Sequence, residues 1–245
     1  MSSNSTLAIP NLYRSVLANG ITLIIVENQA ADIISGRFFL KSAGTIVEQS
    51  EQAGLANLVS AVITKGTENL SALEIAEKVE SIGAGLGTDA TTDYFSLSLK
   101  TVSADFPPML KLLGEIMRSP TFPESEVELE RKLTLQSIRS QKEQPFNVAF
   151  NQLRQQMYPQ HPYGVSVLGT EASVSSLTRN QLQQYHQTYF RPDNLVISLS
   201  GRITQTQGQD LIAGVFGDWE KPDQPLPISQ LQSPMLNPSQ QEIIQ

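Results

Sequence analysis

The sequence predicts an α+β fold in which a mixed, largely antiparallel sheet carries helices packed on one face. Segments with strand character stand at both ends of the chain, and segments with helical periodicity fill the middle. Strands are expected at residues 13–17, 21–26, 33–40, 94–101 and 195–201, which are rich in Ile, Val and Phe or alternate apolar with polar residues. Strands at the two ends of a helical chain are typical of the α+β class.

The helices are predicted from apolar periodicity together with start and stop signals. They are expected at residues 54–63, 71–82, 105–117, 125–141, 145–157, 178–189 and 204–216. Four of them begin with a capping-box pattern, in which Ser or Thr precedes Glu or Gln by three residues, at 71–74, 125–128, 178–181 and 204–207. Between the second helix and the strand at 94–101, the glycines Gly83, Gly85 and Gly87 predict a tight turn.

A change in composition near the end of the chain predicts the domain boundary. Residues 1–11 form a tail, residues 12–221 a single domain, and residues 222–245 a linker rich in Pro and Gln. The linker holds Pro222, Pro225, Pro227, Pro234 and Pro238, so it is expected to stay extended. It is expected to lead toward a second domain that is absent from these 245 residues.

Composition and charge exclude several classes of function. A net charge of −7 argues against nucleic acid and membrane surfaces as partners, because both attract basic patches. The chain has no cysteine, so neither a disulfide nor a thiolate metal site is possible. No secretory pattern and no membrane-spanning apolar run is found, and a cytoplasmic location is therefore expected.

The most informative stretch is Gly54-Leu55-Ala56 with the helix that follows it, and then Lys65-Gly66-Thr67. Leu55, Leu58, Val59 and Val62 give this helix one core face. The frame resembles the zinc-site helix of the insulinase/pitrilysin metallopeptidases, in which Gly-Leu-Ala is followed by His-x-x-Glu-His. Here the two His positions hold Asn57 and Ala61, and the Glu position holds Ser60.

The resemblance extends over nearly the whole predicted domain. It includes Asn19-Gly20, the glycines at 83–87 before Thr92-Asp93-Tyr94, Pro120-x-Phe122, the His-Pro-Tyr-Gly sequence at 161–164, and the segment 189–201. In the family a third zinc ligand, a Glu, lies on a helix downstream. The matching positions are Gln136 and Ser137, and neither is a carboxylate. We call Asn57, Ser60, Ala61, Gln136 and Ser137 the zinc-frame positions.

The resemblance therefore implies a non-catalytic family member, equivalent to the N-terminal domain. An imidazole pair, a carboxylate ligand and a general base are all missing, so no catalytic residue and no metal ligand is expected. Such a subunit would pair with an active homologue as a heterodimer, or associate with itself, and help to enclose peptides; zinc is expected only in the active partner. Gly83, Gly85, Gly87, Asp93 and Tyr94 are candidates for peptide contacts, as is addition of a peptide strand to the sheet edge.

Two alternatives stay open. One is a stand-alone peptide-binding or scaffold protein without a proteolytic partner. The other is an enzyme with a different set of catalytic residues, which the sequence disfavours because it has two separated histidines and no Gly-x-Ser-x-Gly motif. His161 lies in a loop and is expected to be structural, and His186 is expected at the surface or half-buried.

Overall fold

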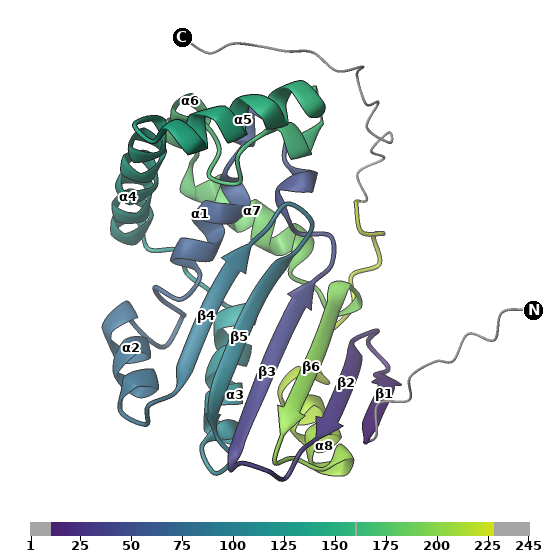
Figure 1. Ribbon diagram of the computed structural model, residues 1–245. Coiled ribbons are helices and arrows are strands. Elements are labelled where there is room, and N and C mark those ends of the chain that lie inside the picture. Colours follow the sequence, from purple (N-terminus) through teal and green to yellow (C-terminus); the bar gives the residue numbers. More distant parts are fainter. Residues whose placement is uncertain (1–10, 160, 228–245) are drawn as a thin grey trace, which may run out of the picture.

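A computed structural model describes residues 11–159 and 161–227 and confirms the α+β class (Figure 1). The sheet has the strand order β1-β2-β6-β3-β5-β4. The strands are β1 (Leu12–Val16), β2 (Thr22–Glu27), β3 (Ile33–Leu40), β4 (Gly85–Ala90), β5 (Phe95–Val102) and β6 (Leu195–Gly201). All neighbouring pairs are antiparallel except β2 and β6, which are parallel.

The late strand β6 lies between two strands from the start of the chain. Ser198 stands opposite Ile24 of β2 and opposite Arg37 of β3. Because the last strand occupies the middle of the sheet, the beginning and the end of the domain are parts of one folded unit.

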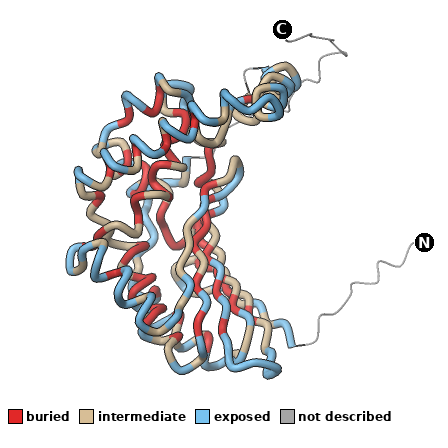
Figure 2. The backbone as a smooth tube through the Cα atoms, turned by 60° about the vertical axis from the view of Figure 1, so that its left-hand side comes forward, coloured by how far each residue is buried: buried red, intermediate tan, exposed pale blue. Residues whose placement is uncertain are grey.

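Within the described residues, helices cover one face of this sheet and none lies over the other face (Figure 2). Alternation within the strands produces this difference: Phe38, Leu97 and Ile197 are fully buried, whereas Arg37 on the opposite side is exposed. The helices are α1 (Leu55–Val62), α2 (Ala72–Glu80), α3 (Phe106–Arg118), α4 (Glu124–Lys142), α5 (Pro145–Met157), α6 (Glu171–Ser176), α7 (Arg179–Tyr189) and α8 (Gln205–Phe216). The 3₁₀ turns are η1 (Thr45–Val47), η2 (Ser50–Gln52), η3 (Pro162–Gly164) and η4 (Pro192–Asn194).

Three predicted helix starts are confirmed and one is wrong. Ser71, Thr178 and Thr204 cap α2, α7 and α8 with complete capping boxes. The predicted box at 125–128 does not form, because α4 begins earlier: the Pro123 carbonyl already accepts the first helical bond, from the Val127 N–H group. Helix α6 was not predicted, since six residues are too few to show a period.

The predicted glycine turn is also corrected. Only Gly83 has a positive φ, of 63°, and strand β4 begins two residues later at Gly85. Glycine is disfavoured in strands, but here the ladder with β5 fixes the backbone of Gly85 and Gly87 in an extended form. The three glycines therefore divide between one turn position and an edge strand.

The structure describes only the first part of the predicted linker. Residues 222–227 form neither helix nor strand, and the side chain of Arg191 donates hydrogen bonds to the carbonyl groups of Pro222 (3.3 Å) and Gln224 (2.8 Å). Residues 228–245 of that linker and residues 1–10 of the predicted tail lie outside the described residues. Within the described part, no helix is both long and apolar enough to cross a membrane.

Two glycines let the backbone at the start of α1 approach a distant loop. Gly54 and Gly169 have φ values of 92° and 77°, in the region that favours glycine. A Cβ atom on Gly169 would overlap the Ala53 carbonyl group, which accepts a hydrogen bond from the Ser173 hydroxyl of α6. The contact thus requires glycine both for its backbone conformation and for space.

We expect Gly169→Ala to lower the free energy of unfolding by about 2 kcal/mol or more, since it adds a left-handed alanine and a backbone clash. Gly214→Ala is the control, because Gly214 lies within α8 with open space around it. That change should raise stability by about 0.5–1 kcal/mol. Urea unfolding of both variants checks this, and equal effects would contradict the role given to Gly169.

Candidate functional site

The amino end of α1 is held by a carboxyl group. Glu48, between η1 and η2, accepts hydrogen bonds from the Gly54 N–H (2.9 Å) and the Ala56 N–H (2.6 Å). These N–H groups have no partner inside the helix, so an acceptor at this point satisfies them. Burial raises the pKa of Glu48 to about 8, although the N–H groups of Ala56, Gly54 and Leu55 act in the opposite direction. Glu48 is thus a mainly protonated cap near pH 7.

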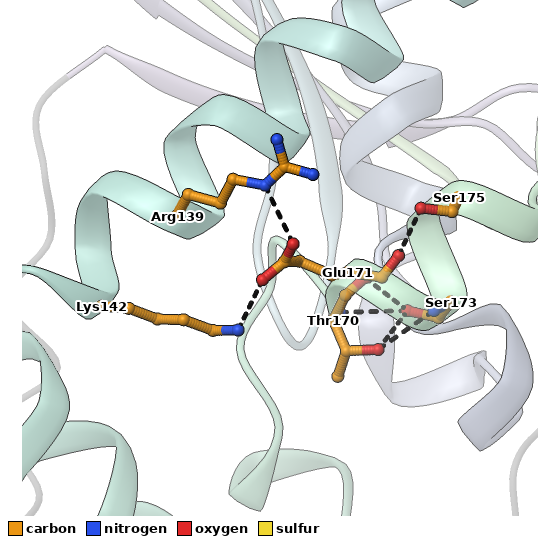
Figure 3. Close-up of polar contacts among 6 residues, drawn as sticks. All are labelled: Arg139, Lys142, Thr170, Glu171, Ser173 and Ser175. Carbon is orange, nitrogen blue, oxygen red and sulfur yellow. Dashed lines mark hydrogen bonds and ion pairs between the residues drawn. The ribbon is translucent and has the colours of Figure 1, made fainter.

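Helix α6 also contacts this end of α1. Figure 3 shows the polar contacts of Glu171 with Arg139 and Lys142 and of Ser173 with Thr170. Ser173 donates a hydrogen bond to the Ala53 carbonyl (2.7 Å) and also completes a capping box with Thr170. The Glu171 carboxylate accepts hydrogen bonds from Lys142 (2.6 Å) and Arg139 (2.9 Å) of α4, and these hydrogen bonds lower the pKa of Glu171. Helices α1, α4 and α6 therefore form one connected support.

The first three zinc-frame positions lie on α1 as the sequence predicts. Asn57 and Ala61 are half-buried and one turn apart, whereas Ser60 is buried. The Ser60 hydroxyl donates to the Asn57 carbonyl (2.8 Å), and the Ser60 carbonyl accepts from the Thr88 hydroxyl of β4 (2.7 Å). The Ser60 proton is thus engaged with the backbone carbonyl of Asn57.

Helix α4 runs beside α1, and an ion pair of 3.0 Å between Lys65 and Glu130 marks the contact. Ser137 lies seven residues after Glu130, close to two full turns, and so on the same side of α4. Gln136 is rotated by about 100° from Ser137. Both are exposed, and the Ser137 hydroxyl donates to the Leu133 carbonyl (3.0 Å). The geometry therefore favours Ser137 as the counterpart of the third ligand.

These side chains do not fit a zinc ion. Zinc in a protein takes imidazole, thiolate or carboxylate ligands, and the zinc-frame positions provide none of them. Among the described residues no group of three His, Cys, Asp or Glu side chains is placed to hold a metal.

The two histidines have structural roles. His161 accepts a hydrogen bond at Nδ1 from the Tyr163 N–H (3.1 Å), as the loop prediction implies. His186 is buried, not half-buried or at the surface as predicted, because α7 packs it between Phe122 and Phe190. Its Nε2 atom lies 2.8 Å from the Met117 carbonyl, and burial lowers the pKa of His186 to about 4.

The predicted peptide-contact residues gather on one hairpin. Gly85 and Gly87 belong to β4, which is the edge strand of the sheet next to α1, and Gly83 precedes it. Asp93 and Tyr94 lie in the turn from β4 to β5. Asp93 accepts a hydrogen bond from the Tyr163 hydroxyl (2.7 Å), and the Tyr94 ring packs edge-on against Phe39.

The edge of β4 has main-chain groups directed away from the sheet. The Thr91 N–H donates to the Tyr94 carbonyl. In an antiparallel ladder every second residue forms such a hydrogen-bonded pair, so Asp89, Gly87 and Gly85 are bonded to β5. The alternate residues Leu86, Thr88 and Ala90 then direct their N–H and C=O groups outward. Sequence reasoning missed Thr88, because its partner Ser60 lies 28 residues away. It also missed Glu48, because its partners Gly54 and Ala56 do not lie at the spacing of a capping box.

Residues 24–171 match the family model described as "Insulinase (Peptidase family M16)". The chain belongs to peptidase family M16. Residues 176–245 match a second M16 model, described as "Peptidase M16 inactive domain". Strand β6 lies in the second match, and β3 and most of β2 lie in the first, so both matches contribute to one sheet.

Curated M16 relatives are about twice as long as this chain. It is 26% identical over 209 residues to the "Uncharacterized zinc protease YmxG" of Bacillus subtilis, covering 85% of this chain and 51% of the relative. It is 28% identical to the "Probable mitochondrial-processing peptidase subunit beta" of Schizosaccharomyces pombe, covering 88% and 47%. A crystal structure described as "peptidase M16 inactive domain" from Pseudomonas fluorescens superimposes with a TM-score of 0.84 at 27% identity, covering 91% and 54%.

The Glu48 cap makes the stability of this M16 domain depend on pH. In the folded state Glu48 keeps its proton up to about pH 8, whereas in the unfolded chain it ionises near pH 4.5. Between these values the folded state binds more protons, so its contribution to stability falls as pH rises, by up to about 1.4 kcal/mol per pH unit. We expect Glu48→Gln to remove this slope.

Free energies of unfolding in urea at pH 5, 6, 7 and 8 check the prediction. Glu51→Gln, an exposed change in the same segment, serves as control and should follow the wild type. Parallel profiles for the wild type and Glu48→Gln would show that Glu48 is ionised in the folded protein.

Proposed function

We propose that this chain is a non-catalytic M16 subunit that holds peptides and works beside an active homologue. One observation carries the proposal: none of the zinc-frame positions, on two helices that lie side by side, holds a zinc ligand or a general base. A single replacement would weaken a metal site. Replacement of both imidazoles, the base and the third ligand leaves neither zinc binding nor a group to activate water.

Peptide binding does not require the metal. Strand β4 has a free edge beside α1, and Thr88 joins this strand to the backbone of Ser60. A peptide added to this edge would pair with main-chain groups at Leu86, Thr88 and Ala90, as in other cases of strand addition. The peptide would then pass the place where active relatives carry out cleavage.

An uncovered helix supports the need for a partner. One side of α5 carries four large, exposed apolar side chains: Phe146, Phe150, Leu153 and Met157. Phe146 is the most exposed of them, at 77%. No residue of α5 is buried, so the helix adds little to the core. Four large apolar side chains in a row are typical of a contact surface. We propose that an M16 partner domain covers them, since the relatives contain about twice this length of chain.

Zinc content tests the loss of the metal site. We expect the purified chain to contain no stoichiometric zinc and to hydrolyse no peptide. The variant Asn57→His, Ala61→His, Ser137→Glu should gain zinc binding, because it restores three ligands on facing helices. Elemental analysis of the dialysed proteins provides the measurement.

The matched control is the variant Asn57→His, Ala61→His, Gln136→Glu, which has the same two histidines but its carboxylate at position 136. That carboxylate lies about 100° away on α4, so weaker zinc binding is expected. Stoichiometric zinc and peptide cleavage by the unmodified chain would refute the non-catalytic function.

Backbone methylation of the ligand tests strand addition at β4. An added strand uses every second N–H group, so methylation of one alternating set should weaken binding by about tenfold or more. Methylation of the other set should leave binding nearly unchanged. Fluorescence anisotropy with two such isomers of one short labelled peptide measures this. Equal binding of both isomers would show that the peptide, if held, is not held by its backbone.

A further inference from the structure

The face of the sheet that lacks helices is built from rows of residues in register. One row reads Arg14, Ile24, Ser198, Arg37, Ser98 and Gly87 from β1 to β4, and the next reads Leu12, Val26, Ser200, Ser35, Lys100 and Gly85. The third row reads Val16, Thr22, Val196, Phe39, Ser96 and Asp89. Residues directly opposite in neighbouring strands share a face. We call these three rows the open face; Figure 2 shows no helix covering it.

The charge of the open face is opposite to that of the protein. The chain has 24 acidic and 17 basic residues. The open face carries three cations, Arg14, Arg37 and Lys100, and one carboxylate, Asp89. The side chains of all three are exposed, and none of these side chains forms an ion pair or a hydrogen bond with another described residue. Their charge is therefore available to a ligand.

Small side chains surround the central cation. Ser98 and Ser198 stand on either side of Arg37, and Gly87 follows Ser98 on the edge strand. Gly85 stands in the same way beside Lys100. A Cβ atom on Gly87 would come within 2.9 Å of the Ser98 hydroxyl oxygen, which places the two residues on the same face. No side chain on β4 thus stands between its outer edge and the two cations.

The distances suit a peptide on that edge. A strand added to β4 would lie two strand spacings, about 10 Å, from Lys100 and three, about 14 Å, from Arg37. A Lys and a Glu side chain extended toward each other can bridge the shorter distance. Arg37 can reach a carboxylate that leans over Gly87 and Ser98, and its planar guanidinium group binds carboxylates in bidentate form.

We propose that the peptides held by this chain are acidic, with carboxylates on alternate residues that meet Lys100 and Arg37 across Gly85 and Gly87. This inference rests on the proposed peptide binding at β4. A peptide is the occupant argued for because the free edge beside the cations presents main-chain groups. Three cations are also too few to hold a nucleic acid against the net charge of −7.

The test uses three labelled peptides with one Thr/Val/Ala frame and Glu, Gln or Lys at alternate positions. We expect the Glu peptide to bind roughly threefold or more tightly than the Gln peptide, and the Lys peptide to bind weakest. The difference should shrink at high salt. Arg37→Gln and Lys100→Gln should each lower the affinity for the Glu peptide toward that for the Gln peptide. Neither variant should change the affinity for the Gln peptide.

Lys111→Gln is the matched control, because it removes the same charge from an exposed position on α3, on the helical side. Equal binding of all three peptides, or an equal loss in Lys111→Gln, would overturn the acidic preference while the Gln peptide still demonstrates peptide binding. If no peptide binds at any charge, the proposed peptide binding fails and this inference fails with it. Sedimentation of the wild type and Arg37→Gln completes the test, since a dimer lost in the variant would make the open face a self-association surface instead.

Discussion

The buried amino end of α1 is the constraint on which the rest of the site depends. Three contacts meet there: the close approach of Gly54 and Gly169, the Glu48 carboxyl group on the free N–H groups, and the Ser173 hydroxyl on the Ala53 carbonyl. Together they fix the axial position and rotation of a helix of only two turns, which would be marginal alone. That rotation determines that Asn57 and Ala61 are half-buried and that Ser60 meets β4.

This arrangement explains how the zinc-site frame can persist without its ligands. Leu58, Val59 and Val62 are fully buried, so the core determines their identity. Asn57 and Ala61 lie on the half-buried side, where packing places weaker demands on the side chain. The helix, with its Gly54-Leu55-Ala56 start and the Lys65-Gly66-Thr67 segment after it, therefore does not depend on imidazoles at positions 57 and 61.

The sequence predicts local structure well and long-range placement poorly. The periodicity of Leu55, Leu58, Val59 and Val62 and the caps at Ser71, Thr178 and Thr204 depend on neighbouring residues, and the structure confirms them. The insertion of β6 between β2 and β3 depends on contacts across more than 150 residues, which no local pattern encodes. Gly85 and Gly87 show the same limit, because their extended form comes from pairing with β5 and not from their own preference. Thr88 was missed for this reason as well, because it bonds Ser60 on another element.

The net charge of the chain and the charge of its open face act over different ranges. At physiological salt a surface charge is screened within about 8 Å, so a ligand on the sheet responds to the nearby charges of Arg37 and Lys100 more than to the net charge of the whole protein. An acidic protein can therefore hold an acidic peptide at one place. The same screening disfavours a long polyanion, whose many phosphates would extend past three cations onto acidic surface. In the proposed complex local charge selects the ligand, and Gly85 and Gly87 matter because the absence of a side chain there keeps the path to that charge clear.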